Sequence, residues 1–251
     1  MKKASLLLIL FLFFQSLIYS QNGICEGGNC KNGFGHHYIK TTNEIYHGYF
    51  KDAKYNGIGM YSNNEGMYYS QFTNGKMNGY TVYYQKGNIS AGNFINGIKN
   101  GVHFINADKQ GSIDRIVVTY EKGKELSREF LKVTSENFNS GKDCISGDCD
   151  NGNGIFLIKA QNVLVIGKFE KNAMVEGEYL NIQYGESDYF AVPKDLTNPY
   201  FKFSKLPMKE GGLLEIAAMY ITSKKNGQAV MYQTKSKEIS GVIYKNDELV
   251  K

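Results

Sequence analysis

Residues 46–104 repeat one pattern three times: YHGYFKDAKYNGIGMYSNNEGM (46–67), YYSQFTNGKMNGYTVYYQKGNI (68–89) and SAGNFINGIKNGVHF (90–104). In each unit a Phe is followed six residues later by an Asn-Gly pair, and both recur at a spacing of 22. A fixed period of this length is typical of stacked repeats, in which each unit buries the apolar face of its neighbour. The stretch therefore predicts a repeat architecture.

Each unit has the features of a β-hairpin. Asn-Gly suits a two-residue type I′ turn, because that turn requires positive φ at both central positions. Apolar positions alternate with polar ones on either side of the pair, so each set faces one side of a sheet. We expect successive hairpins to build one elongated antiparallel sheet, with aromatic rings lying on Gly48 and Gly92. The predicted turns are Asn56-Gly57, Asn78-Gly79 and Asn100-Gly101.

These units resemble the MORN repeat family. The segments YHGYFKDAKYNGIG (46–59), YSQFTNGKMNG (69–79) and AGNFINGIKNG (91–101) match its pattern, with Ala53 and Ser70 standing where the family has Gly. The resemblance implies an all-β repeat protein that serves as a scaffold or interaction surface. The fold alone does not choose among the functions of such a family.

Two similar segments, CEGGNCKNGFG (25–35) and CISGDCDNGNG (144–154), begin two repeat arrays. The same cysteine-bearing opening unit is familiar from bacterial MORN-like proteins. Four cysteines behind a signal peptide suggest disulfides, and pairing within each segment is the simplest of three connectivities. We expect each bond to hold the exposed first hairpin of its array. The predicted pairs are Cys25 with Cys30, and Cys144 with Cys149.

The sequence offers little evidence for catalysis or metal binding. A zinc site of the four thiols, or of His36 and His37, is the alternative to disulfides, but two distant Cys-x4-Cys pairs are a weak zinc signal. None of the four histidines has a repeated acidic partner, and no motif of a nucleophile, phosphate loop or zinc protease is present. We expect Glu65, Glu176 and Glu178 to be solvated. The prediction is a non-enzymatic protein without catalytic residues, metal or cofactor.

The N-terminal residues 1–20, MKKASLLLILFLFFQSLIYS, have the layout of a secretory signal peptide. An uncleaved anchor is the alternative, although the apolar core is shorter than the roughly 20 residues of a spanning helix. Removing this leader lowers the net charge from +5 to +3, which argues against a nucleic-acid partner. The protein should be secreted, to a bacterial periplasm or the cell exterior.

The predicted organisation is a first array over residues 21–132, a junction over 133–143 and a second array over 144–251. All three prolines fall within 184–212, so we expect an irregular insertion there, packed on the sheet or functional. Residues 113–120, 213–220 and 242–244 should be strands.

Tyrosines recur along the first array, and we expect them mainly to pack against one another across neighbouring strands. They are also the best binding residues that the sequence offers, since each joins apolar area to a polar tip. We expect a surface that binds an unidentified protein or envelope component. Direct contact with membrane lipid, as the family name suggests, and antitoxin-like binding of a toxin are the alternatives. The candidate binding residues are Tyr49, Tyr61, Tyr83 and Tyr84.

Overall fold

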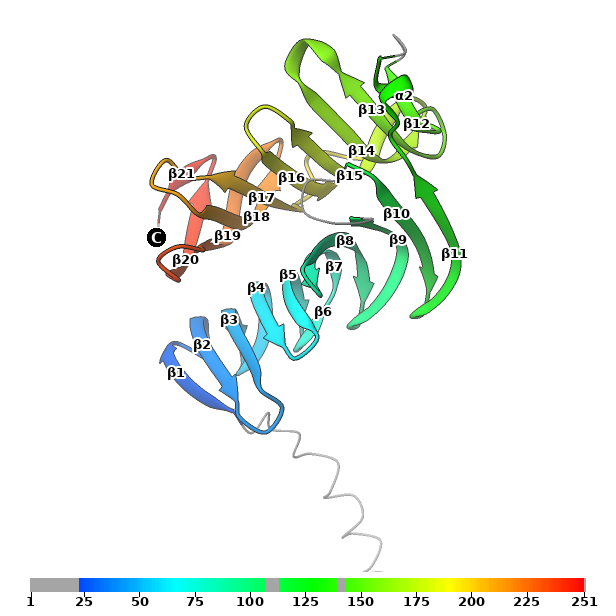
Figure 1. Ribbon diagram of the computed structural model, residues 1–251. Helices are drawn as coiled ribbons and strands as arrows, with labels where there is room; N and C mark the ends of the chain where they lie inside the picture. The colour runs from blue at the N-terminus through cyan, green and yellow to red at the C-terminus, as the bar shows by residue number, and fades with distance from the viewer. Residues whose placement is uncertain (1–22, 107–112, 140–142, 251) are drawn as a thin grey trace, which may run out of the picture.

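The computed structural model describes residues 23–106, 113–139 and 143–250, so the predicted signal peptide lies outside the described residues. The described chain is almost entirely antiparallel strand, arranged in two sheets (Figure 1). This confirms the all-β class and the two arrays of stacked hairpins.

The first sheet holds eleven strands that neighbour one another in chain order, apart from the short β6, which pairs with β5 alone. Its strands are β1 (Ile24–Gly28), β2 (Gly33–Ile39), β3 (Glu44–Lys51), β4 (Lys54–Asn63), β5 (Gly66–Thr73), β6 (Lys76–Met77), β7 (Gly79–Gln85), β8 (Asn88–Ile95), β9 (Ile98–Asn106), β10 (Arg115–Glu121) and β11 (Lys124–Leu131).

The second sheet follows the helix α2 (Ser135–Asn139) and holds ten strands, again in chain order. A single 3-10 turn, η1 (Lys159–Gln161), separates two of them. Its strands are β12 (Cys144–Gly147), β13 (Asn153–Ile158), β14 (Val163–Glu170), β15 (Ala173–Asn181), β16 (Glu186–Ala191), β17 (Tyr200–Pro207), β18 (Leu213–Ile221), β19 (Lys224–Gln233), β20 (Ile239–Lys245) and β21 (Glu248–Leu249).

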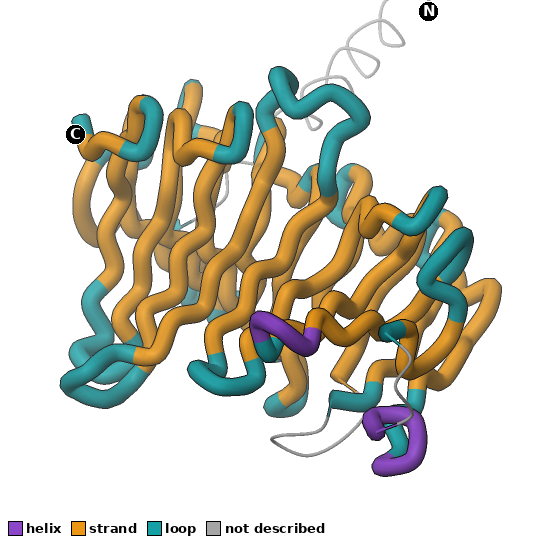
Figure 2. The backbone as a smooth tube through the Cα atoms, turned by 90° about the horizontal axis from the view of Figure 1, so that it is seen from above, coloured by secondary structure: helices purple, strands orange, loops and turns teal. Residues whose placement is uncertain are grey.

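The second sheet folds back over the first, so the last strands lie near the first ones (Figure 1). Strand β20 contacts β3, β19 contacts β4, and β17 contacts β5. Seen from above, the strands run side by side along the molecule and the turns line its margins (Figure 2). We call the faces that meet the inner faces and the opposite ones the outer faces. The core between the sheets contains Tyr49, Ile58, Met60, Tyr69, Tyr80, Val82, Ile89, Ala91, Tyr189, Phe201, Phe203, Ala217 and Val230.

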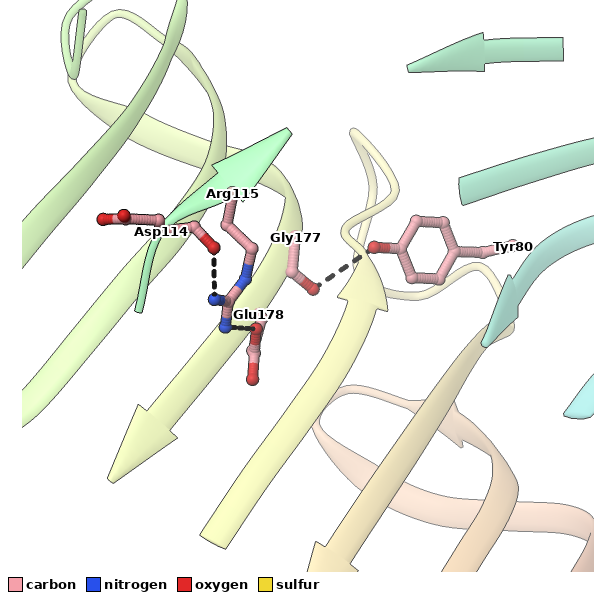
Figure 3. Close-up of polar contacts among 5 residues, drawn as sticks. All are labelled: Tyr80, Asp114, Arg115, Gly177 and Glu178. Atoms are coloured by element: carbon pink, nitrogen blue, oxygen red, sulfur yellow. Dashed lines mark hydrogen bonds and ion pairs between the residues drawn. The ribbon is translucent and has the colours of Figure 1, made fainter. Parts of the chain in front are cut away.

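Polar groups also join the inner faces. Arg115 of β10 forms an ion pair of 2.8 Å with Glu178 of β15, and the Tyr80 hydroxyl donates to the Gly177 carbonyl (Figure 3). The Glu215 carboxylate accepts hydrogen bonds of 2.6 Å from both Tyr69 and Tyr84. These contacts connect the two sheets through groups removed from water.

The prediction that Glu176 and Glu178 are solvated is therefore wrong. Glu178 is 4% exposed and pairs with Arg115. Glu176 accepts a hydrogen bond of 2.8 Å from Asn93 of the first sheet, and burial raises the pKa of its carboxyl. Both residues face inward because the second sheet has a partner on that side.

The hairpin turns lie four residues before the predicted ones. Asn74-Gly75 and Asn96-Gly97 have positive φ at both positions, as a type I′ turn requires, and Asp52-Ala53 takes their place in the first unit. The predicted turn at Asn56-Gly57 is wrong, because this pair lies inside β4 where the register with β3 shifts. Gly57, Gly79 and Gly101 keep a positive φ, so the Asn-Gly pair that was predicted as the turn of each unit forms a bulge or a strand start instead.

Aromatic rings do lie on Gly48 and Gly92, as predicted, but each ring comes from the same repeat unit as its glycine and not from the next unit. A Cβ atom built on Gly48 would lie 2.5 Å from the Tyr46 ring, and one on Gly92 would lie 2.4 Å from the His103 ring. Both distances are far shorter than a van der Waals contact. The rings of the outer face therefore lie directly on the backbone, which only glycine permits.

The proline segment 184–212 contains two regular strands joined by the loop 192–199, so the prediction that it is irregular and not interior sheet is wrong for those strands. Strands β16 and β17 both come from it and are interior to the second sheet. Pro193 lies in the loop between them, Pro199 immediately precedes β17 and Pro207 ends it. Proline is tolerated at a strand end, where the ladder needs no N–H from it.

Both predicted disulfides are present, Cys25–Cys30 and Cys144–Cys149, with Cα atoms 6.0 and 5.9 Å apart. Each links the first strand of its sheet to the following turn. They suggest an oxidising, extracytoplasmic environment. Among the helices of the described residues, none combines the length and apolar character needed to span a bilayer.

The strand predictions for the other segments are confirmed. Residues 113–120 overlap β10, which runs from Arg115 to Glu121, residues 213–220 lie in β18, and residues 242–244 lie in β20. The very short β21 follows β20 and ends the second sheet.

Candidate functional site

The outer face of the first sheet is filled by a continuous ladder of aromatic rings. Two buried clusters occupy it, and Tyr61 and Met77 pack against both. Rings of successive strands touch, as Tyr46 does by stacking on Tyr55 with centroids 3.8 Å apart. The buried members of these clusters are Tyr46, Phe50, Tyr55, Phe72, Tyr68, Tyr83 and Phe94.

The outer face of the second sheet has no such continuity. One buried cluster covers β14 and includes Val165 and Phe169, and another covers β18 and β19 and includes Tyr220 and Ala229. The two clusters share no residue. Between them lies the outer face of β15, β16 and β17, which we call the second-sheet groove.

An ion pair lies in the middle of this groove. Lys202 of β17 contacts Asp188 of β16 at 2.8 Å, and the Ser204 hydroxyl donates to the same carboxylate at 2.5 Å. Asp188 stands opposite Ser204 in the strand register, and Lys202 stands opposite Phe190. Charged side chains thus replace the apolar rungs that the repeat places on an outer face, and a hollow opens on each side of them.

The first hollow, of about 410 Å³, is lined by both polar and apolar side chains, and we call it the acidic hollow. Two carboxylates, Glu186 and Asp188, are the charged groups of its lining, and Tyr179 forms one wall. The carboxylates make the hollow a site for a cationic or hydrogen-bond-donating group. Its lining is Ile158, Gln161, Val163, Tyr179, Asn181, Glu186, Ser187, Asp188 and Leu206.

The second hollow, of about 280 Å³, is mostly aromatic, and we call it the aromatic hollow. Tyr179 packs edge-on against Phe190 with ring centroids 5.1 Å apart. The Lys202 ammonium lies 5.4 Å from the centroid of Tyr220 and 5.9 Å from that of Phe190. The lining is Tyr179, Phe190, Val192, Leu196, Tyr200, Lys202, Tyr220 and Ser223.

Two phenols of the groove, Tyr179 and Tyr220, have a raised pKa and are uncharged donors at neutral pH. Burial raises the pKa of Tyr179, and burial together with the charge of Asp188 raises the pKa of Tyr220. Tyr179 is 40% exposed and Leu196 is 45% exposed, so apolar surface of both reaches solvent. The groove therefore joins exposed apolar area, neutral hydroxyls and carboxylates, a combination suited to binding.

A hollow of similar size, about 440 Å³, lies beside the first disulfide. It is lined by residues of the repeat's own turns, such as Asp52 and Gly75, with His37 and Phe50. The second-sheet groove differs because its lining departs from the repeat. We therefore take the groove as the candidate binding site.

The structure does not bring the four predicted tyrosines into one exposed row. Tyr49 and Tyr84 face the second sheet, where their hydroxyls donate to the Val242 carbonyl and to Glu215. Tyr61 and Tyr83 belong to the outer ladder of the first sheet, and Tyr83 is 1% exposed.

The groove residues were not found from the sequence. The break in the repeat over 184–212 was their signal, and it was visible in the three prolines. The sequence did not show, however, how the strands of this segment pair with the other strands of the array. In the part of the chain that the structure describes, no three His, Cys, Asp or Glu side chains are grouped to hold a metal ion.

Comparison with known proteins adds no identity. No protein-family model matches the chain, and no curated protein matches it.

Proposed function

We propose that this protein is a non-enzymatic, exported repeat protein of the MORN type, and that it binds a protein partner of the cell envelope in the second-sheet groove. The repeat units, the rings on glycine and the predicted leader support the architecture and the compartment. The observation that carries the binding role is that the buried residues of the outer-face clusters stop at β14 and resume at β18, with half-buried ones such as Tyr200 and Leu206 between them.

The chemistry of the groove supports binding rather than turnover. Asp188 is held in place by Lys202 and Ser204, and its carboxylate, with about four acceptor sites, can still accept a hydrogen bond from a ligand. Tyr179 stands between the two hollows and belongs to both linings. A partner that covers Tyr179 would fill both hollows at once, which concentrates the contact on one aromatic side chain.

Photo-crosslinking tests the proposal. A photoreactive amino acid at position 196 lies in the groove, and the same amino acid at position 126 lies on the exposed β11, away from it. In envelope extract we expect a saturable adduct from position 196 and not from position 126. Tyr179→Ser should abolish this adduct, whereas Tyr184→Ser, at a 60% exposed tyrosine outside the lining of either hollow, should leave it unchanged.

Equal adducts from both positions, or an adduct that Tyr179→Ser does not affect, would count against the groove. Flotation with vesicles of mixed anionic and neutral lipid separates the lipid alternative. If the protein floats at physiological salt and Tyr179→Ser prevents flotation, the groove binds membrane instead of a protein partner.

A further inference from the structure

Three side chains with metal-binding donor atoms stand in one row across β2, β3 and β4, which neighbour one another in the first sheet (Figure 1). His36 of β2 lies directly opposite His47 of β3, and His47 lies directly opposite Met60 of β4. Directly opposite residues of antiparallel strands have Cβ atoms about 4.5–5.5 Å apart. The row therefore places two imidazoles and one thioether side by side.

All three side chains are on the inner face. Met60 belongs to the core between the sheets, as does Tyr49, two positions after His47 on β3. Phe34, two positions before His36 on β2, packs against the same core. Alternate residues of a strand share a face, so the two imidazoles point into the space that Met60 also borders.

The imidazoles already meet through their metal-binding atoms. The Nδ1 atoms of His36 and His47 lie 2.6 Å apart, so one hydrogen lies between them and at least one nitrogen directs its lone pair at the other. A metal ion can replace that hydrogen. Two nitrogen–metal bonds of about 2.0 Å at 120° put the nitrogens about 3.5 Å apart, so the rings must separate by about 1 Å. Both histidines are only partly buried, which permits this rotation.

The donor set selects the kind of ion. Two neutral imidazoles and a thioether carry no negative charge, whereas Ca²⁺ and Mg²⁺ need oxygen ligands and structural Zn²⁺ sites are built mainly from thiolate and imidazole. Thioether sulfur is a soft ligand that favours Cu⁺. We propose that His36, His47 and Met60 form a binding site for a soft monovalent ion, Cu⁺ or its redox-inert analogue Ag⁺. The site is independent of the second-sheet groove.

The two histidines that are adjacent in the sequence are not the two that could hold the ion. His36 and His37 are adjacent in the chain, but neighbouring residues of a strand point to opposite faces. His37 lies on the outer face, where its Nδ1 is 2.8 Å from the Tyr55 hydroxyl. The partner of His36 is eleven residues away, and only the hairpin brings the two together.

Competition with a chromophoric Cu⁺ chelator, bicinchoninate, tests the site on the exported protein; ascorbate under anaerobic conditions keeps copper as Cu⁺ and leaves both disulfides intact. The protein should withdraw one Cu⁺ per chain from the chelator. Met60→Leu keeps the volume and apolar character of the side chain but removes the sulfur, and should weaken binding by about tenfold or more. His47→Gln should weaken it further.

Two matched variants serve as controls. Met67→Leu changes another methionine packed against the same core, and His37→Gln changes the neighbouring histidine on the outer face; both should bind Cu⁺ as the unmodified protein does. Urea unfolding of each variant without metal identifies any that fail to fold. In chloride-free buffer, Ag⁺ should shift the NMR resonances of the His36 and His47 rings in the unmodified protein.

Three results would overturn the proposal: no withdrawal of Cu⁺ from the chelator, unchanged affinity in a folded Met60→Leu variant, or an equal loss in the two control variants. Tighter binding of Zn²⁺ than of Cu⁺, with no effect of Met60→Leu, would also overturn it, because the thioether would then have no role.

Discussion

Replacing Arg115 by Met should destabilise the fold by about 3–5 kcal/mol, because it leaves the Glu178 carboxylate buried without its partner. The side chains of the pair are 3% and 5% exposed, so water cannot take the place of the guanidinium. The two residues come from different sheets, β10 and β15, as Figure 3 shows. For a domain of this size the loss corresponds to a fall in Tm of roughly 6–20 °C.

The double variant separates an unpaired charge from lost packing. Glu178→Gln keeps an oxygen for the Tyr189 hydroxyl that contacts this carboxylate but removes the negative charge. Arg115→Met with Glu178→Gln should therefore recover most of the stability lost in either single variant, since replacing a buried ion pair by neutral groups is often close to neutral. Urea unfolding followed by tyrosine fluorescence gives the three free energies. A single Arg115→Met variant within 1 kcal/mol of the unmodified protein, or a double variant as unstable as the two losses together, would refute the reasoning.

Three further outcomes follow from the described residues. Burial, with a smaller contribution from Lys99, lowers the pKa of His103 to about 4. Since the unfolded value is near 6.5, the stability from a neutral His103 is complete above pH 6.5 and falls by about 3 kcal/mol towards pH 4; His103→Gln should flatten this part of a urea–pH curve, and an unchanged slope would exclude the residue as its source. Cys25 is exposed and Cys149 is 8% exposed, so stepwise reduction with alkylation and mass spectrometry should open Cys25–Cys30 first; simultaneous opening would contradict this order. Ala53 has a φ of 57° in a position that favours glycine, so Ala53→Gly should stabilise the fold by about 1 kcal/mol in thermal unfolding, while Gly75→Ala, where a Cβ would meet nothing within 4 Å, should cost a similar amount; the same sign for both changes would refute the backbone argument.

The local features of this fold were open to prediction because each depends on a short stretch of chain. The 22-residue period predicts the hairpins, and the spacing within a unit predicts the rings on Gly48 and Gly92. Each disulfide joins cysteines that lie within six residues of chain. The turn positions were not, since the later units each hold two Asn-Gly pairs four residues apart. Both pairs place glycine at positive φ, one in the turn and one after it, so turn chemistry alone cannot rank them.

The relation between the sheets depends on residues far apart in the chain. Glu178 and Glu215 of the second sheet look like solvated strand residues until the first sheet covers them, and their partners Arg115 and Tyr69 lie 63 and 146 positions away. A strand pattern states which residues share a face but not what covers that face. The inner polar contacts, and the row of His36, His47 and Met60, therefore required coordinates.

The second-sheet groove and the aromatic ladder of the first sheet both depend on which side chains the strands place on the outer face. Where glycines let rings lie on the backbone, as under Tyr46, the rings of successive strands pack against one another across the outer face. In β16 and β17 the polar and charged side chains Asp188, Lys202 and Ser204 stand on that face instead. The sheet tolerates this because the inner side of the same strands carries Phe201 and Phe203, both buried in the core between the sheets. Strands β16 and β17 are therefore held in the fold by their inner face, while their outer face departs from the repeat. A binding surface on such strands costs the fold less stability than it would elsewhere in this architecture, and the exposed Tyr179 lies beside them.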